Sequence, residues 1–155
     1  MNKAVLFCYD GSEGSKSALA AAAGLVMHPA DAVVLAVWTP VAIQLARGGS
    51  LMSAVPNDGE IDEEERAAAQ RIAEEGAAAA RAHGYGATAR IAQANESVAR
   101  SIGDVAREID AGLIVCGQRG RGAITTALLG SVSHALSAHA ERPVLIAPQT
   151  MSHST

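Results

Sequence analysis

The segment "GLIVCGQRGRGAITTALLGSVSHAL", residues 112–136, contains the pattern that decides the fold. It begins as a short apolar run, continues through a loop rich in glycine and arginine, and ends as an amphipathic helix. Four glycines and two arginines fall between Cys116 and Gly130. Glycine at that density costs backbone entropy on folding. The loop is therefore expected to be built around something that needs close approach to the backbone.

The same alternation of strand and helix extends along the rest of the chain. Strands are predicted at residues 3–9, 32–38, 87–94, 112–117 and 143–148. Helices are predicted at about 15–27, from the acidic run 58–65 to about 83, at 98–109 and from 131 to about 140. This order predicts an α/β fold, a single doubly wound, Rossmann-like domain over residues 1–150. We expect a five-stranded parallel sheet of order 3-2-1-4-5 with helices on both faces, and a frayed tail at 151–155.

Composition excludes several classes of protein. The 155 residues suffice for one domain, and the net charge of −4 argues against a nucleic-acid binder. The apolar runs are shorter than the roughly 20 residues that cross a bilayer. The N-terminal apolar run is too short for a secretory signal. We therefore expect a cytoplasmic protein with no membrane or nucleic-acid partner.

The cysteines and histidines show no metal or disulfide pattern. Cys8 and Cys116 are too few for a disulfide framework, and each lies near the end of a predicted strand. We interpret them as small buried apolar residues, with redox sensing as the alternative. The five histidines lack HxH and HExxH spacings, so no metal site made of protein ligands alone is predicted.

The predicted strand order places two glycine-bearing turns together. In doubly wound sheets, ligands bind beyond the carboxyl ends of the strands at the point where the strand order reverses. For this order, that crevice lies between the first and fourth strands. These strands end at "YDGS", residues 9–12, and "CGQRGRG", residues 116–122. The two turns are therefore expected to face each other.

The first turn, "DGSEGSKS" at residues 10–17, is not a Walker-type phosphate loop. Aligned on Lys16 and Ser17, both glycines that such a loop requires are missing. Gly11 instead suits a tight turn, and Ser12 or Ser15 suits a helix cap. Asp10 is placed to contact a ribose hydroxyl or a metal carried by a nucleotide, and the alternative is a turn or capping aspartate.

The later turn carries the stronger signal. It has the form Gly117-x2-Gly120-x9-Gly130-Ser131. Its glycines allow backbone approach to a ligand, and the helix that starts near Gly130 presents free N–H groups to an anion. The hydroxyls of Ser131 and Ser133 are predicted donors to phosphate, and Arg119 and Arg121 add positive charge. The alternative is a flexible surface loop followed by a helix cap.

Together these segments resemble the universal stress protein family. The resemblance covers Lys3 to Pro148 through "YDGSEGSKSAL", "GQRGRGAITTALLGSVSHAL" and "RPVLIAP". The nucleotide-binding branch of that family is marked by G-x2-G-x9-G-(S/T), and every marked position is present. Gln118, where relatives often have serine, and Cys8, sometimes glycine, are departures that would alter affinity or nucleotide preference.

The resemblance implies a site for ATP, or for AMP or a cyclic nucleotide, with Mg²⁺ or Mn²⁺ carried by the nucleotide. Asp10 would contact the ribose or the metal-phosphate region, and the backbone of Val37 would meet the adenine. The residues implied to wrap the ribose and phosphates are Gly117, Gly120, Gly130, Ser131 and Ser133. The neighbours that complete the predicted binding set are Gly11, Arg121, Gly122 and Val132.

Three outer segments suggest further contacts. The last strand, between Pro143 and Pro148, is an apolar sheet edge, and in the family such a strand builds an antiparallel homodimer. The loop 39–59 is predicted to be a flap over the nucleotide, a dimer contact or disordered. The acidic run 58–65 suits the solvated first turn of a helix, or else a surface for an unknown protein partner.

The leading functional hypothesis is an ATP-binding universal stress protein that acts as a regulatory module for stress or energy state. A slow ATPase or phosphotransferase is an alternative, but Asp10 is the only candidate for a base in these motifs, so at most weak hydrolysis is expected. A nucleotide-free dimeric interaction scaffold is a second alternative. The paired acids of a receiver domain and the aromatic residues of a flavin site are missing.

Overall fold

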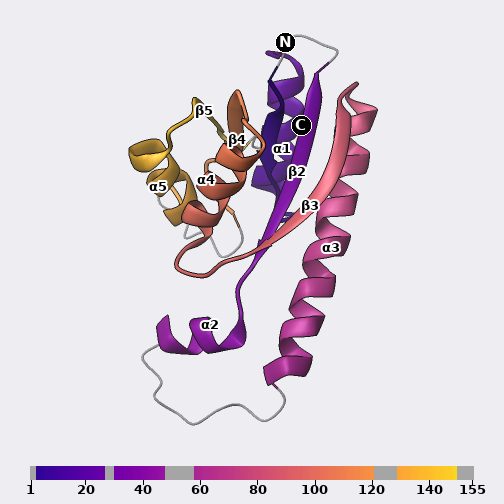
Figure 1. The fold of residues 1–155 in the computed structure, drawn as a ribbon. Coiled ribbons are helices and arrows are strands. Elements are labelled where there is room, and N and C mark those ends of the chain that lie inside the picture. Colours follow the sequence, from indigo (N-terminus) through magenta and orange to yellow (C-terminus); the bar gives the residue numbers. More distant parts are fainter. Residues whose placement is uncertain (1–2, 27–29, 48–57, 121–128, 150–155) are drawn as a thin grey trace, which may run out of the picture.

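The computed structural model describes residues 3–26, 30–47, 58–120 and 129–149. Its sheet has five parallel strands in the order β3-β2-β1-β4-β5, which confirms the predicted topology (Figure 1). The strands are β1 (Val5–Cys8), β2 (Asp31–Trp38), β3 (Gly86–Gln93), β4 (Leu113–Gly117) and β5 (Val144–Ala147). The helices are α1 (Glu13–Ala23), α2 (Val41–Arg47), α3 (Asp58–Ala82), α4 (Val98–Glu108) and α5 (Ser131–His139).

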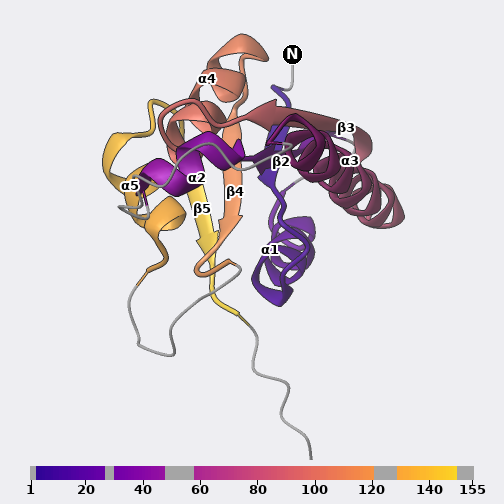
Figure 2. The ribbon, with the colours of Figure 1, turned by 90° about the horizontal axis from the view of Figure 1, so that it is seen from below.

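Helices cover both faces of the sheet, α1 and α3 on one and α4 and α5 on the other (Figure 2). Side chains along β1 alternate between the two faces of the sheet, so they contribute to the apolar core on both faces. Val5 and Phe7 are buried with α1 and α3, whereas Leu6 is buried with α4 and α5. Because both faces are covered, the central strands are almost continuously apolar.

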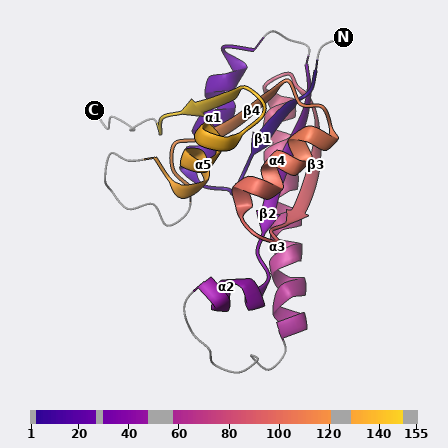
Figure 3. The same ribbon diagram turned by 60° about the vertical axis from the view of Figure 1, so that its left-hand side comes forward.

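Helix α3 packs on the sheet through a stripe of alanines. Ala69, Ala73, Ala77 and Ala80 are buried at spacings of a helical turn. Their small side chains allow the helix to lie close to β2 and β3. The first turns of α3 extend beyond the carboxyl end of the sheet (Figures 1 and 3). Glu63 and Glu64 in these turns are exposed.

The loop prediction for residues 39–59 was wrong in part, because α2 forms between Val41 and Arg47. The helix follows Pro40 and lies beside the first turns of α3 (Figure 3). The Val41 N–H donates to Asp62 Oδ1 of α3 at 2.8 Å, which satisfies a donor at the start of α2. Residues 48–57 lie outside the described part of the chain, so the predicted flap is not tested there.

Capping residues determine where α1 and α4 begin and where α1 ends. Ser12 is the N-cap of α1 and accepts the Ser15 N–H, so this helix begins two residues before the predicted start. Gly24 ends α1 earlier than predicted. Ser97 caps α4, as predicted. Among the described helices, none is long and apolar enough to cross a membrane.

A charged cluster joins three elements at the amino end of the sheet. Asp110, in the left-handed region with φ of 49°, follows α4. Its Oδ1 accepts from Lys3 Nζ at 3.1 Å and from an Arg142 guanidinium nitrogen at 2.6 Å. The hydrogen bond from Arg142, then that from Lys3, lowers the pKa of the Asp110 carboxyl. The cluster lies at the opposite end of the sheet from the glycine-bearing turns.

Candidate functional site

The turns after β1 and β4 meet at the carboxyl edge of the sheet. Phe7 of β1 is paired with Val115 of β4, so the two strands end side by side. A Cβ built on Gly117 would lie 2.7 Å from the main-chain carbonyl carbon and oxygen of Gly14. The backbones of the two turns are therefore in direct contact, as the strand order predicted.

Asp10 links the first turn to the second. Its Oδ1 accepts the Ser12 N–H at 2.9 Å, across a tight turn in which Gly11 has φ of 77°. Its Oδ2 faces the other loop, where a Cβ on Gly120 would come within 2.5 Å. The hydrogen bond that closes the turn and the approach to the glycine loop are thus made by the two oxygens of one carboxylate.

The start of α5 holds the same glycine loop from the other side. Gly130 is the N-cap of α5, and its N–H donates to the Gln118 carbonyl at 2.9 Å. The Ser133 hydroxyl approaches the same carbonyl at 2.8 Å. The Gln118 N–H donates to the Ala147 carbonyl at 2.8 Å, so β5 also anchors the loop. The positive end of the α5 dipole therefore lies against the loop.

The structure brings together most of the predicted binding residues that it describes. Gly11, Gly117, Gly120 and Gly130 lie in the two adjoining turns with Asp10. Ser131 and Val132 form the first turn of α5, with Ser131 exposed and Val132 packed against the core.

Two other predicted residues have different positions. Ser133 is only 2% exposed, and its single hydroxyl proton faces main-chain carbonyls, so its contact with phosphate stays a prediction. Val37 lies near the end of β2, two residues after Leu35, whose carbonyl accepts the Tyr9 N–H. It is therefore close to the carboxyl end of β1, but half-buried. Arg121 and Gly122 lie outside the described residues.

A family model for the universal stress protein family matches residues 1–148. The chain belongs to this family. No curated protein sequence matches it.

Solved structures of this family share the fold over nearly their full length. A universal stress protein family member from Burkholderia pseudomallei is 26% identical, with a TM-score of 0.68 over 94% of this chain and 96% of that one. The universal stress protein from Archaeoglobus fulgidus in complex with dAMP is 19% identical, with a TM-score of 0.65 over 94% and 97% of the two chains. A family protein from Arabidopsis thaliana with AMP bound is 15% identical, with a TM-score of 0.64 over 99% and 95%.

Sequence reasoning missed Gly14 in this universal stress protein family member. Gly14 is the second residue of α1 and is buried, and a Cβ on it would lie 2.2 Å from the Arg119 carbonyl oxygen. The family motif does not mark this position. No signal in the local sequence could have found it, because the helix was predicted to begin at about residue 15 and the contact is made with a loop far along the chain.

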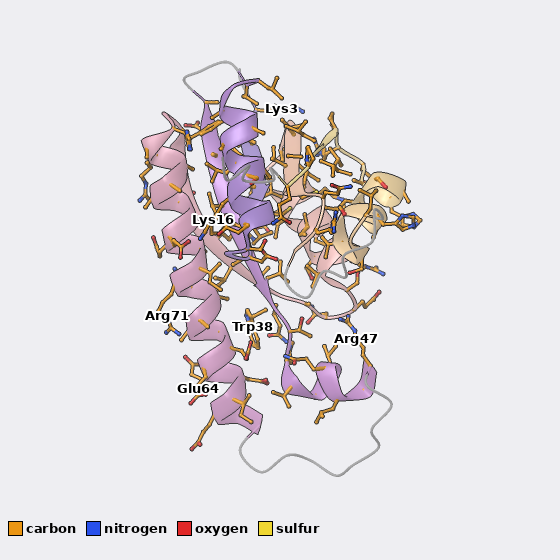
Figure 4. All side chains as sticks on the ribbon, turned by 180° about the vertical axis from the view of Figure 1, so that it is seen from behind. Lys3, Lys16, Trp38, Arg47, Glu64 and Arg71 are labelled. Atoms are coloured by element: carbon orange, nitrogen blue, oxygen red, sulfur yellow. The ribbon has the colours of Figure 1, made fainter. Side chains whose placement is uncertain are left out.

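Lys16 lies between two glutamates, one on α1 and one on α3. Figure 4 shows Lys16 on the side of α1 that faces α3. Its Nζ lies 3.9 Å from Glu75 Oε1 and 3.7 Å from Glu13 Oε1. The same Glu75 oxygen accepts the Tyr9 hydroxyl at 2.8 Å. Burial, followed by this hydrogen bond, raises the pKa of Tyr9 above its ordinary value. Lys16 therefore forms ion pairs with acids of both helices, which is consistent with the absence of a Walker-type loop.

The two thiols lie under the site, at the ends of β1 and β4. Burial raises the pKa of Cys116 to about 11. Burial, with smaller effects from Cys116 and Asp10, raises the pKa of Cys8 well above its usual range. Both side chains pack in the layer with α4 and α5. The neutral thiol is therefore favoured in each.

A hollow of about 500 Å³ lies between α4 and α5. The arginines that line it have acidic partners: Arg107 bonds Asp104 at 3.1 Å, Arg100 bonds Glu96 at 2.5 Å, and Arg142 bonds Asp110 at 2.6 Å. Among the residues that the structure describes, none of those lining this hollow belongs to the glycine loops. No three His, Cys, Asp or Glu side chains of the described segments are grouped as a metal site.

Proposed function

We propose that this protein holds an adenine nucleotide, ATP in the first instance, where the turns after β1 and β4 meet the start of α5. The observation that carries the proposal is the convergence of Asp10, Gly120 and Gly130 at one edge of the sheet. Free N–H groups at a helix start bind phosphate, and glycines let phosphate reach the backbone. The dAMP and AMP carried by two relatives support the choice of ligand.

Each part of the nucleotide has a partner of suitable chemistry. Phosphates would lie against the glycine loop and the exposed Ser131 at the start of α5. The Asp10 carboxylate would accept from ribose hydroxyls, or bind through water to Mg²⁺ or Mn²⁺ carried by the phosphates. The backbone of Val37 would meet the adenine.

The protein then acts as a regulatory module, whose bound nucleotide reports stress or energy state to a partner. Hydrolysis needs a group that orients water near the terminal phosphate. In the sequence motifs Asp10 is the only candidate for such a group, and one of its two oxygens already accepts the Ser12 N–H. A binding module therefore fits the site better than a dedicated ATPase. The predicted cytoplasmic location stays a prediction.

A homodimer through β5 is the second part of the proposal. β5 pairs with β4 along one side, and Val144, Leu145 and Ile146 are each half-buried. In the part of the chain that is described, β5 is one of the two edge strands of the sheet, with β3 at the other edge. Pairing of two such edges covers apolar side chains and main-chain groups together.

The deciding experiment is gentle denaturation of purified protein, with mass spectrometry of the released nucleotide and calorimetric titration of ATP with Mg²⁺. We expect adenine nucleotide near one per subunit, or saturable heat with that stoichiometry. Gly130→Leu should abolish binding, because its side chain would enter the space at the start of α5.

Gly24→Leu is the matched control, since a Cβ there would lie 3.6 Å from the Ala21 carbonyl oxygen, an ordinary contact. It should bind like the unmodified protein. An empty protein with no titration heat and no thermal shift would overturn the proposal in favour of a scaffold. Full affinity in Gly130→Leu would overturn the phosphate assignment alone.

A further inference from the structure

We propose that Gly14 is a positioning residue for nucleotide binding: it lets the glycine loop seat its backbone on the first turn of α1. This inference rests on the proposed function and adds to it a residue outside the family motif. Gly14 lies in the first turn of α1, which follows β1, whereas the loop that it contacts follows β4.

The contact leaves no room for a side chain. A Cβ on Gly14 would lie 2.2 Å from the Arg119 carbonyl oxygen and 3.3 Å from its carbonyl carbon. From the opposite side, a Cβ on Gly117 would lie 2.7 Å from Gly14. Every close atom belongs to the main chain, so rotation of a side chain cannot relieve the overlap. The loop or the helix would have to withdraw by about 1 Å to restore ordinary contact.

The loop cannot withdraw without loss elsewhere. Directly before Arg119, the carbonyl of Gln118 accepts the Gly130 N–H at 2.9 Å, and the Gln118 N–H is bonded to Ala147 at 2.8 Å. These bonds hold the loop against α5 and β5. A methyl group on Gly14 would therefore push on a segment that is held from the far side.

The displacement would reach the residues that face the nucleotide. Gly120 directly follows Arg119, and its Cα lies so close to Asp10 that a Cβ would come within 2.5 Å of Oδ2. Moving the Arg119 carbonyl thus alters the spacing between the loop and the Asp10 carboxylate. In enzymes, a misplacement of about 1 Å can cost about a hundredfold in rate. We expect the altered spacing here to weaken nucleotide binding.

Helix stability alone would favour alanine at this position, because glycine is among the poorest helix formers. The matched control is Gly103 in α4, where a Cβ would meet nothing within 4 Å. Gly14→Ala and Gly103→Ala make the same chemical change in helices of eleven residues each. Only the first places a methyl group against the loop.

The test combines two measurements on the full chain. Calorimetric titration of ATP with Mg²⁺ should show at least tenfold weaker binding for Gly14→Ala and unchanged binding for Gly103→Ala. Amide NMR spectra without nucleotide should show shifts at residues 117–120 and at Asp10 in Gly14→Ala alone. Gly117→Ala approaches the same contact from the loop and should shift the Gly14 and Ser15 amides, which keeps the test available if Gly14→Ala does not fold.

Two results would overturn the inference: unchanged loop amides in Gly14→Ala, or shifted loop amides with undiminished affinity. If the unmodified protein binds no nucleotide, the proposed function fails, and with it the binding role of Gly14. The amide shifts would still show whether Gly14 seats the loop. The two failures are therefore distinguishable.

Discussion

Single residues at the end of β1 and β4 have chemistry set by their burial. Cys116 is 3% exposed, and Cys8 is half-buried beside it in the next strand. Both thiols have a raised pKa because burial disfavours the thiolate. Since the thiolate is the reactive form, these cysteines are expected to be poor nucleophiles.

The first prediction concerns thiol labelling. With a pKa of about 11, Cys116 should react with iodoacetamide at pH 8 on the order of a hundredfold more slowly than an exposed cysteine of ordinary pKa. Intact-protein mass spectrometry follows the reaction, and Cys8→Ser isolates Cys116. In guanidinium chloride both thiols should react at ordinary rates. Fast labelling of the native protein would favour the redox-sensing alternative.

The position of a site residue could be predicted from the sequence where a motif or a turn marks it. Asp10, Gly117, Gly120 and Gly130 were predicted from their order along the chain, and the structure places them in the two adjoining turns. Gly14 was not predictable, since its role depends on the distance to a carbonyl in a loop about a hundred residues away. The same is true of Ser133, whose burial against Gln118 is a tertiary effect.

The packing of α3 on the sheet depends on the absence of a side chain at Gly76. A Cβ there would lie 2.7 Å from Tyr9 Cδ1 and 2.7 Å from Val34 Cγ1. Both are ring or branched core groups with little freedom to move.

The second prediction is that Gly76→Ala lowers the free energy of unfolding by about 1–3 kcal/mol, because overpacking outweighs the gain in helix propensity. Urea denaturation followed by circular dichroism gives the value. Gly103→Ala should instead raise the free energy of unfolding by up to about 1 kcal/mol. Equal stabilisation by both changes would contradict this account of the helix-sheet contact.

The third prediction concerns the charged cluster that joins β1, α4 and β5. The pKa of Asp110 is lower in the folded protein, so its carboxylate stabilises the fold above the ordinary Asp value of about 3.9. That contribution is lost as the pH falls through the folded-state pKa. Asp110→Asn should therefore lower the free energy of unfolding at pH 7.

This difference between Asp110→Asn and the unmodified protein should shrink as the pH falls below about 3.9. Asparagine tolerates the left-handed backbone, so the change isolates charge from conformation. Urea denaturation at a series of pH values measures it. A difference that is independent of pH would assign the effect to something other than ionisation of Asp110.

Elements were predictable where the apolar period is long and the caps are clear. The stripe of α4 and its Ser97 cap are examples. Helix α2 was missed because seven residues between Pro40 and a glycine-bearing segment give no clear period. Its start depends on a hydrogen bond to Asp62 of α3, which local sequence does not reveal.

The strand order of the sheet could be predicted from the alternation of strands and helices along the chain. How two copies would pair depends on the main-chain groups that β5 presents at the edge of the sheet. The carbonyl of Pro143 accepts from Ile114 of β4 at 2.9 Å, and that of Ala147 accepts from Gln118, directly after β4, at 2.8 Å. Alternate peptide groups of a strand face opposite sides. The N–H of Ile146 therefore points toward the open edge of the sheet.

The fourth prediction follows from that direction. Ile146→Pro removes an outward N–H but no bond to β4, so it should convert a dimer into a monomer at micromolar concentration. Ile146→Ala loses the same side-chain packing but keeps the N–H, and it should stay dimeric. Sedimentation equilibrium measures both, with circular dichroism to check the fold. A monomeric unmodified protein would contradict the proposed dimer.

The way helix α3 extends beyond the sheet also has a consequence for how fast its amide hydrogens exchange. Its later turns, from Ala69 to Ala80, are buried on the sheet, whereas its acidic first turns extend beyond the sheet edge. The amide hydrogens of one continuous helix should thus exchange with solvent by two routes. Those near Glu64 exchange through local opening, and those near Ala77 exchange when the whole domain unfolds. A ligand or partner that contacts the extended turns would slow the first route and leave the second as it was.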